Sequence, residues 1–368
     1  MLVEVDKTSF NNASDIAAMK QNLMIYGATG FVGQELAAMA VRKGLKPVLA
    51  GRNEDMLKPL AEKLGLEFRA FDLNDAQIIT ENLSGVTVLL NCAGPFKYTW
   101  KPLVEACIAK SVHYLDITGE IPVFEGIASY DQEAKEKKVM LLPGAGFDVT
   151  PTDCLSMYLK EKLPKGTRLE LGFFSDGPAG LPPGTNNTMI EQIPYGNRIR
   201  QNGKLIKPPK GIKTRLIDFG KGMQKSVRLT WGDVFTAYQS TGIPNIEVYA
   251  SFPETVIKQL KMIEAIRPIL SLPFVLNILR KRKTKGSTEA ERQETLMHVW
   301  GELSDEKGNK VNARLHGPEG GVVWTSECAL AIVNKIISGN SVPGYQTPAK
   351  AYGADLVMEC EGVTREDI

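Results

Sequence analysis

The chain has 368 residues, which is enough for two domains of ordinary size. Hydrophobic residues make up 43% and charged residues 23% of the chain, and 44 basic residues against 42 acidic ones give a formal net charge of +2. This composition excludes a disordered chain, a fibre and a coiled coil. We expect no nucleic-acid partner, because such binding depends on clustered positive charge and the chain has no overall excess.

Cysteine and histidine are too sparse and too far apart to form a metal site. The five cysteines stand at 92, 107, 154, 328 and 360, without a C-x-x-C pair, and no two of His113, His298 and His316 share a helical turn. We therefore expect no metal, reduced thiols and a cytoplasmic location. Residues 1–20 lack the pattern of a secretory signal and are predicted to be a disordered tail or a tag.

The first half of the chain alternates short apolar runs with helical patterns, which is typical of βαβ units and a parallel sheet. The predicted strands are 23–27, 46–51, 67–73, 86–94, 113–119 and 139–146, and the main helices between them are 31–44, 54–65, 99–111 and 125–138. Six strands with such crossovers predict a doubly wound parallel sheet of the Rossmann type over residues 21–154.

The pattern changes after residue 165, where strands become longer and alternate apolar with polar residues. The predicted strands are 168–174, 224–234, 245–252, 296–303 and 309–317, and the predicted helices are 185–194, 254–266, 325–338 and 347–360. We predict a second, α+β domain for substrate binding and dimerisation over 155–322, giving an α/β fold overall. The C-terminal helices of 323–368 are candidates to return to the first domain, and we expect a homodimer.

The sequence Gly27-Ala-Thr-Gly30-Phe-Val-Gly33 joins the first predicted strand to the first predicted helix. Gly27 permits the tight turn, Gly30 lets the backbone approach a pyrophosphate, and Gly33 lets the helix pack close to the strand. In this strand–turn–helix setting the motif predicts a dinucleotide site, with the phosphates at the helix N-terminus. The predicted contacts are Gly27, Ala28, Thr29, Gly30, Phe31, Val32 and Gly33.

The end of the second strand indicates which dinucleotide is bound. NAD sites usually place a carboxylate there, whereas this chain has Gly51, Arg52 and Asn53. A guanidinium matches a 2′-phosphate in bidentate geometry, so the sequence favours NADP(H). The ends of the third and fourth strands should border the same crevice. Their predicted contacts are Asp72 and Leu73, and then Cys92, Ala93, Gly94, Pro95 and Phe96.

Tyr158 and Lys162 have the Tyr-x-x-x-Lys spacing that short-chain dehydrogenases use for proton exchange with the substrate oxygen. The upstream serine that such enzymes need is absent, and Ala145 stands in its place. The pair is therefore better interpreted as one solvated face of a helix.

Several blocks together resemble the saccharopine dehydrogenase-like oxidoreductases, in particular the trans-acting enoyl reductase branch. The blocks are YGATGFVG (26–33), LAGRN (49–53), LLNCAGPF (89–96), HYLDITGE (113–120), PGAGFDVTPTD (143–153), GPEGGVVWTSECALAI (317–332) and PGYQTPAKAYGADLV (343–357). The resemblance implies a Rossmann domain with an inserted α+β domain, NADP(H), and hydride transfer to a C=N or C=C bond. The chain departs from the family at GTNNTM (184–189), which bears on the substrate more than on the cofactor.

The same blocks contain the candidate catalytic residues. Strand alternation puts Tyr114 and Asp116 on one face of the fifth strand, whose end should open into the crevice. Asp148 and Asp153 flank the turn that leads into the second domain. We take Tyr114, Asp116 and Asp148 as candidates for an acid or a substrate-orienting group, with a structural role as the alternative. For Asp153 we expect an N-cap of the following helix.

Three functions remain open on this evidence. The first is an NADP(H)-dependent reductase of a conjugated C=C bond in a lipid- or polyketide-like substrate, free or bound to a carrier. The second is a reductase of an imine between an amino acid and a keto acid, which needs arginines converging on carboxylates. Arg198, Arg200, Arg215 and Arg228 are available for that role. The third is a catalytically silent dinucleotide-binding protein.

Residues 266–279 are apolar, contain Pro268 and Pro273, and run directly into the basic sequence RKRKTK at 280–285. The simpler prediction is a buried helical hairpin that leads into a solvated loop. The alternative is an element at a membrane surface, with peripheral contact through 266–285 and the basic residues facing anionic headgroups.

Overall fold

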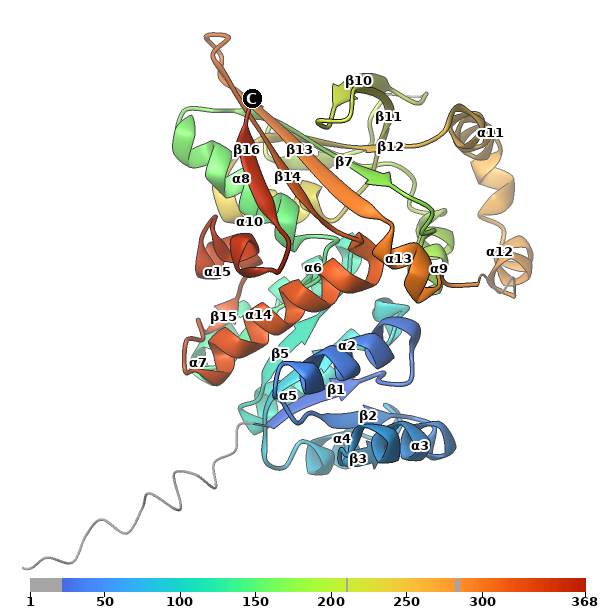
Figure 1. Ribbon diagram of the computed structural model, residues 1–368, viewed down its shortest axis with the longest axis vertical. Helices are drawn as coiled ribbons and strands as arrows, with labels where there is room; N and C mark the ends of the chain where they lie inside the picture. Colours follow the sequence, from blue (N-terminus) through green and yellow to red (C-terminus); the bar gives the residue numbers. More distant parts are fainter. Residues whose placement is uncertain (1–21, 210, 282–284) are drawn as a thin grey trace, which may run out of the picture.

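Two β-sheets form two domains that are stacked along the long axis of the molecule (Figure 1). The computed structural model describes residues 22–209, 211–281 and 285–368. The N-terminal part of the chain forms the lower domain in Figure 1, and most of the remainder forms the upper one. The fold is α/β, with a Rossmann-type parallel sheet and a second domain built on a mixed sheet, as the sequence predicts.

Seven parallel strands form the first sheet in the order β15-β6-β5-β4-β1-β2-β3. They are β1 (Asn22–Tyr26), β2 (Val48–Gly51), β3 (Phe68–Ala70), β4 (Val86–Asn91), β5 (His113–Asp116), β6 (Met140–Leu142) and β15 (Gly344–Tyr345). Their helices are α2 (Phe31–Arg42), α3 (Glu54–Leu64), α4 (Ala76–Asn82), η1 (Phe96–Tyr98), α5 (Trp100–Lys110), α6 (Ile121–Ala128) and α7 (Asp131–Glu136). The strand order reverses between β1 and β4, which is where such sheets open a ligand crevice.

Helix α3 shows how local sequence sets the bounds of these elements. The side chain of Asn53 accepts a hydrogen bond from the backbone N–H of Met56 at 3.2 Å and so caps the first turn. Gly65 ends the helix in the left-handed conformation, with φ at 66°. Leu57 and Ala61, which lie four residues apart, are the buried face that packs against the sheet.

Within the described residues the second sheet has nine strands, and only its β12–β7 pair is parallel. Its main order is β10-β11-β12-β7-β13-β14-β16, with β8 paired to β12 and β9 paired to β8. The strands are β7 (Arg168–Asp176), β8 (Ile199–Gln201), β9 (Lys204–Ile206), β10 (Thr214–Asp218), β11 (Met223–Leu229), β12 (Asn245–Ser251), β13 (Leu296–Ser304), β14 (Lys310–Pro318) and β16 (Thr364–Asp367). The helices are α8 (Thr150–Lys162), α9 (Pro183–Gln192), α10 (Asp233–Thr241), α11 (Glu254–Leu270), α12 (Pro273–Arg280) and α13 (Glu289–Gln293).

The core of the second domain lies between this sheet and helices α8 and α10. Leu155 and Leu159 of α8 are buried against β13, where the strand carries Gly301. A Cβ at Gly301 would lie 2.7 Å from Cδ1 of Leu159, so the glycine lets the helix lie close to the strand. The apolar face of α8 is therefore covered by the sheet rather than by solvent.

The C-terminal part of the chain contacts both domains. It contains η2 (Gly320–Trp324), α14 (Thr325–Ile337), α15 (Pro348–Tyr352) and η3 (Leu356–Glu359). Helix α14 packs on α2, with an ion pair of 3.0 Å between Lys43 and Glu327, and β15 adds to the first sheet beside β6. Strand β16 then pairs with β14 of the second sheet. The single helix predicted over 347–360 is two short ones, because Gly353 turns the chain with φ at 82°.

One helical stretch in the described part of the chain, Gly320–Ile337, is long and apolar enough to cross a membrane by length and composition alone. Of this stretch, 67% is buried inside the fold. Its apolar residues pack on α2, β4 and β14, as expected of a core helix.

Asp153 does not cap a helix, contrary to the sequence prediction. Helix α8 begins at Thr150, one turn earlier, so Asp153 lies within it. Its buried carboxylate accepts hydrogen bonds from the hydroxyl of Ser240 and from the backbone N–H of Ala349, the latter at 2.8 Å. Asp153 therefore joins α8 to α10 and α15.

Residues 266–279 form a helical hairpin, as predicted, but the prediction that this hairpin is buried is wrong. The segment does form the helical turn from α11 into α12, but Ile269 and Phe274 are 59% and 63% exposed. Leu276 is its one buried large apolar side chain. The hairpin lies at the edge of the molecule and packs mainly through α12 on α9 (Figure 1). Most of its large apolar side chains are therefore not covered by the rest of the fold. Of the basic run that follows, residues 282–284 lie outside the described residues.

Candidate active site

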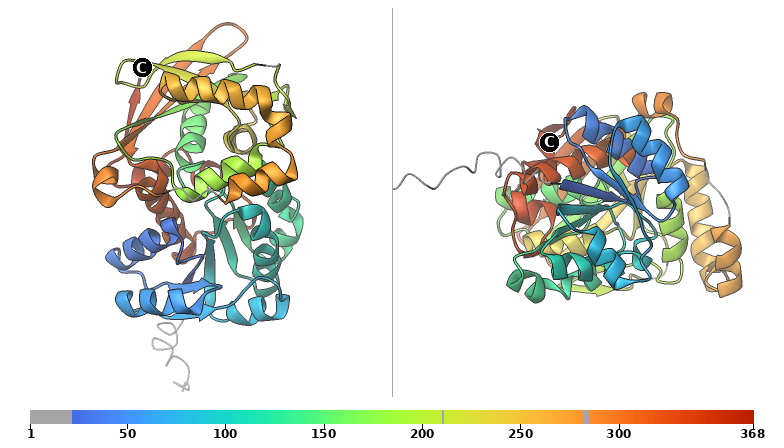
Figure 2. Two further views of the ribbon diagram at one scale, coloured as in Figure 1. Left: turned by 90° about the vertical axis from the view of Figure 1, so that its right-hand side faces the viewer. Right: turned by 90° about the horizontal axis from the view of Figure 1, so that it is seen from below.

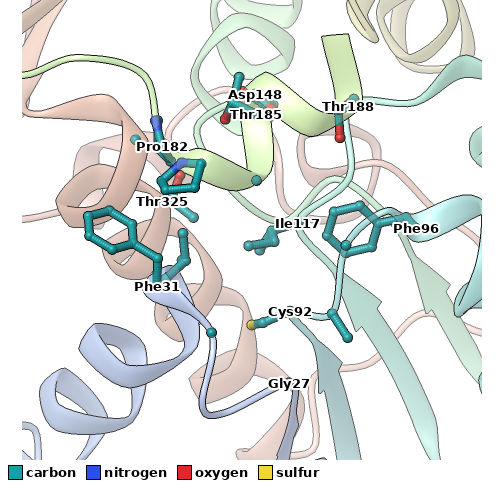
Figure 3. Close-up of a pocket in the computed structure, with 18 of the residues that line it drawn as sticks. Gly27, Phe31, Cys92, Phe96, Ile117, Asp148, Pro182, Thr185, Thr188 and Thr325 are labelled. Carbon is teal, nitrogen blue, oxygen red and sulfur yellow. The ribbon is translucent and has the colours of Figure 1, made fainter. Parts of the chain in front are cut away.

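A cavity of about 490 Å³ lies between the two domains, at the carboxyl ends of β1, β2 and β4 (Figure 3). Loops of the first domain form one wall, and α9, Trp231 and the residues around Gly321 and Thr325 form the opposite one. The volume is in the usual range for a small-molecule or cofactor site. The crevice predicted from the strand order is therefore present, and it is closed by the second domain.

At the turn after β1, the backbones of this turn, of the loop after β4 and of α2 lie in close contact, because glycines there leave no side chain between them. Gly27 has φ at 83°, and a Cβ on it would lie 2.7 Å from the backbone nitrogen of Ala93. A Cβ on Gly33 would overlap the carbonyl oxygen of Gly27. Helix α2 begins with Gly30 as its N-cap, without a side-chain cap bond and without an acidic residue in its first turn. Its first N–H groups thus fit a pyrophosphate at this edge of the cavity.

Most of the predicted cofactor contacts are in the cavity lining. Those present are Gly27, Thr29, Gly30, Phe31, Val32, Gly51, Arg52, Asn53, Cys92, Ala93, Gly94 and Phe96. Ala28 is fully buried beneath the turn, and Gly33 serves the helix packing described above. Pro95, Asp72 and Leu73 are also outside the lining, and the Asp72 carboxylate accepts a hydrogen bond from the Asn74 N–H at 2.8 Å. The predicted contact of β3 with the cofactor thus has no counterpart in the cavity.

Arg52 lies at the end of β2, exposed on the rim of the cavity. Its guanidinium forms no ion pair with any residue that the structure describes. The neighbouring Asn53 side chain is already used as the cap of α3. A free guanidinium at this strand end can hold an anionic group of the cofactor. Among the described residues, Asp148 has the only carboxylate in the cavity lining.

Asp148 enters the cavity from the loop that crosses into the second domain (Figure 3). Burial raises the pKa of its carboxyl to about 7, because the charged form loses its hydration. No hydrogen bond to this carboxylate comes from the residues within the described ranges. The indole N–H of Trp231 donates to the Asp148 carbonyl oxygen at 2.9 Å and so fixes its backbone. Asp148 can therefore hold a proton near neutral pH while facing the cavity.

Tyr114 and Asp116 lie behind the cavity wall and are absent from its lining. They share one face of β5, as alternation predicts, and the Tyr114 hydroxyl donates to the Asp116 carboxylate at 2.9 Å. That carboxylate also accepts the N–H groups of Thr118 and Gly144, each at 3.0 Å. The bonds tie the end of β5 to the loop after β6. This geometry assigns the pair a structural part, and the predicted contact with substrate finds no support in it.

Several residues that shape the cavity were not predicted from the sequence. Glu120 accepts hydrogen bonds from the N–H groups of Phe96 and Lys97, at 3.0 and 3.2 Å, and from the hydroxyl of Thr188 at 3.4 Å. It thereby joins the loop after β4 to α9. Helix α9 contributes Gly184, Thr185, Thr188, Met189 and Gln192 to the lining. The signal for α9 was present, because GTNNTM is the stretch at which the chain departs from the family pattern.

Tyr158 and Lys162 are outside the cavity lining, on the surface of α8. Tyr158 donates to the carboxylate of Asp367 at 3.0 Å, and Lys162 forms an ion pair with the same carboxylate. The guanidinium of Arg365 stacks over the Tyr158 ring at 3.8 Å. The cluster fastens β16 to α8, which agrees with the interpretation of the pair as a helix face.

Comparison with known proteins connects these features to a family. Residues 23–142 match the family model described as the saccharopine dehydrogenase NADP binding domain. The saccharopine dehydrogenase-like oxidoreductase of Homo sapiens is 28% identical over 183 residues, covering 44% of this chain and 42% of that protein. A Mycobacterium tuberculosis protein named as a trans-acting enoyl reductase is 32% identical over 146 residues, covering 37% of this chain and 34% of that protein. The matched part thus spans less than half the length of these relatives.

A solved structure shares the whole fold. Saccharopine dehydrogenase (L-Glu forming) of Saccharomyces cerevisiae superposes with a TM-score of 0.64 over 95% of this chain and 100% of that chain, at 12% identity. Fold, cavity and glycine-rich turn together define a two-domain protein with an NADP-binding domain. In its NADP-binding domain the chain is similar to the saccharopine dehydrogenase-like oxidoreductases.

Replacing Asp116 with alanine should destabilise the fold. Asp116→Ala leaves the buried N–H groups of Thr118 and Gly144 without an acceptor, so we expect a loss of about 3 kcal/mol in the free energy of unfolding. Tyr114→Phe removes one hydrogen bond to the Asp116 carboxylate and should lower the free energy of unfolding by about 1 kcal/mol. Urea unfolding measures both. Equal stability of Asp116→Ala and the unmutated protein would contradict this assignment.

Replacing Tyr158 with phenylalanine should leave catalysis intact. Tyr158→Phe removes one exposed hydrogen bond to Asp367, outside the cavity lining, so NADPH affinity and turnover should stay within about twofold of the unmutated protein. Turnover is measured with any substrate that the unmutated protein reduces. A loss of about a hundredfold, the usual scale for a missing general acid, would restore the short-chain dehydrogenase interpretation.

Proposed function

We propose that the protein is an NADP(H)-dependent reductase of a C=C bond conjugated to a carbonyl group in a lipid-like substrate, with Asp148 as the proton donor. The observation that carries the proposal is the Asp148 carboxyl on the cavity, opposite the glycine-rich turn (Figure 3). Its pKa of about 7 lets it hold and release a proton at neutral pH.

The first domain supplies the parts that a dinucleotide needs. The N–H groups at the start of α2 would hold the pyrophosphate, and the Arg52 guanidinium would hold the 2′-phosphate. The small residues Cys92, Ala93 and Gly94 leave room beside the turn for the ribose and the nicotinamide. When bound there, NADPH supplies the hydride, which is the chemistry that the protein itself lacks.

The chain's own contribution to the reduction is a proton and its position. Addition of hydride at the β-carbon of a conjugated carbonyl compound leaves an enolate, which must gain a proton at the α-carbon. Asp148 carries that proton on its carboxyl, and transfer leaves a carboxylate that regains a proton from solvent. Trp231 keeps the Asp148 backbone in place through its indole N–H. Glu120 accepts hydrogen bonds from the Phe96 N–H and the Thr188 hydroxyl, so it links the loop that carries Phe96 to α9 on the other side of the cavity.

The cavity favours a neutral, apolar substrate over an amino-acid imine. The imine requires arginines that meet carboxylates, and Arg52 at the cofactor end is the one arginine in the lining. Arg198 and Arg200 donate to backbone carbonyls, and Arg215 and Arg228 form ion pairs with glutamates of the second sheet. The substrate half of the cavity is lined instead by Phe96, Ile117, Met189 and Trp231, together with Thr185, Thr188 and Gln192.

The names of two relatives support this substrate class. One is the Mycobacterium tuberculosis protein named as a trans-acting enoyl reductase. The other is a Caenorhabditis elegans protein named lipid droplet localized protein, which is 26% identical over 156 residues. Both names point to chemistry or surroundings in which substrates are apolar.

Turnover should depend on the Asp148 proton. We expect oxidation of NADPH with an α,β-unsaturated acyl thioester and none with a keto acid plus an amino acid. Because the carboxyl must be protonated to act as the acid, kcat should fall as the pH rises through about 7. Asp148→Asn should lower kcat by about 10²- to 10⁴-fold, the usual contribution of a general acid, while NADPH affinity is kept.

A buried carboxyl outside the cavity provides the matched control for Asp148. Asp153→Asn changes a carboxyl whose pKa is also raised by burial, to about 6, but which is absent from the lining. This variant should keep its turnover and its pH profile. Unchanged turnover of Asp148→Asn would reject Asp148 as the donor, and a lack of turnover with both substrate classes would favour a silent dinucleotide-binding protein.

Cofactor preference should depend on Arg52. We expect NADPH to bind at least tenfold more tightly than NADH, a difference of about 1.4 kcal/mol, because the guanidinium meets the 2′-phosphate. Arg52→Asp should abolish or invert the preference, measured by fluorescence titration of each reduced cofactor. Lys58→Asp makes a charge change of the same sign on exposed α3 outside the lining and should leave the preference unchanged. Equal affinities in the unmutated protein would refute the assignment.

A further inference from the structure

The outward surface of α11 and α12 carries six large apolar side chains, which we call the hairpin patch. They are Met262, Ile266, Ile269, Leu272, Phe274 and Ile278, with exposed fractions from 38% to 63%. With Ile263, which is 38% exposed, seven of the 17 exposed large hydrophobic residues in the described ranges fall between Met262 and Ile278. Such a concentration on the surface of a folded domain indicates an interaction site.

The spacing of the hairpin patch puts its members on one side of the hairpin. Met262, Ile266 and Ile269 follow one another at intervals of four and three residues along α11, and Phe274 and Ile278 are four apart on α12. The two helices stand out from the edge of the molecule in Figure 1 and in the right-hand view of Figure 2, which are perpendicular to each other. The patch is therefore a protruding apolar surface rather than a groove.

Within the described residues, the charged side chains of the hairpin, and of the chain directly after it, that lack an ion pair are all lysines. Lys258, Lys261, Lys281 and Lys285 are exposed, and none of them forms an ion pair with another residue of the described ranges. The acidic residues of α11 are paired, Glu254 with Lys225 and Glu264 with Arg267. An amphipathic helix with apolar residues beside unpaired lysines has the composition of an element that lies in the headgroup region of an anionic bilayer.

The inner side of the same hairpin borders a second cavity, of about 130 Å³. Leu260 and Ile263 of α11 line it, together with Met189, Gln192 and Trp231. The last three residues also line the 490 Å³ cavity, so the two cavities adjoin across α9. Helix α11 is thus adjacent, across α9, to the cavity that contains Asp148.

We propose that the hairpin patch docks the protein on the surface of an anionic membrane. A fluid bilayer can accept a protruding apolar surface, whereas a protein partner would need a matching hollow. The four unpaired lysines complement anionic headgroups. Docking requires neither cofactor nor turnover, so this proposal goes beyond the proposed function, and either can fail without the other.

Sedimentation of the full chain with lipid vesicles tests the docking. The vesicles are phosphatidylcholine with phosphatidylglycerol, at low salt, and binding should weaken as added salt screens the lysines. Ile269→Ser/Phe274→Ser should weaken binding at least tenfold. Leu216→Ser/Met223→Ser removes two equally exposed apolar side chains, 59% and 62%, from β10 and β11 and should leave binding unchanged. Unchanged NADPH affinity shows that each variant is folded.

A second set of variants tests the charge component. Lys258→Gln/Lys261→Gln/Lys281→Gln should weaken binding to the anionic vesicles and remove its salt dependence, and vesicles of phosphatidylcholine alone should bind more weakly. Three results would overturn the proposal. These are no sedimentation at low salt, equal sedimentation of the two serine pairs, or a fall in molecular mass of Ile269→Ser/Phe274→Ser that shows a second copy covering the patch.

Discussion

The cofactor side of the structure depends on one close contact between backbones. Gly27 passes over Ala93, and Gly33 lies against the Gly27 carbonyl, so β1, β4 and α2 meet where no side chain intervenes. Any Cβ here would push α2 away from the sheet and turn its free N–H groups from the cavity. The same contact places the loop after β4 beside the turn, where Glu120 fixes it to α9. The second domain is thereby held over the edge of the first sheet.

Burial raises the pKa of Asp116, Asp148 and Asp153 by the same cause, yet their chemistry differs through their partners. Asp116 and Asp153 accept hydrogen bonds from backbone N–H groups and hydroxyls, whereas Asp148 faces the cavity without such a donor. Between about pH 4 and 7 the folded state holds more protons on these groups than the unfolded state does, so they lower stability as the pH rises. A buried carboxyl with a raised pKa thus lowers the stability of the folded state, and carboxyls with such shifts are common at functional sites.

The sequence predicted those features that local rules determine. The glycine turn, the strands of the parallel sheet and the position of Arg52 at a strand end required only neighbouring residues. Alternation put Tyr114 and Asp116 on a common face, but it could not tell that this face points into the core. Helix α9 reaches the cavity from far along the chain, and β15 pairs through two residues only, so tertiary packing decides both. Helix α10 was missed because its first residues resemble the end of the strand before it.

The apolar hairpin and the cavity wall are joined by one buried carboxylate. Glu191 of α9 accepts from Arg280 of α12 at 2.5 and 2.9 Å and pairs with Lys97, beside Phe96, at 2.5 Å. Arg280 and Lys97 lower the pKa of Glu191, which therefore stays charged. If α12 moved alone, the buried Glu191 carboxylate would lose its ion pair with Arg280. Breaking a buried ion pair costs far more free energy than breaking an exposed one. The hairpin and α9 should thus move together, so that a force on the outer surface of α12 reaches the residues that line the cavity.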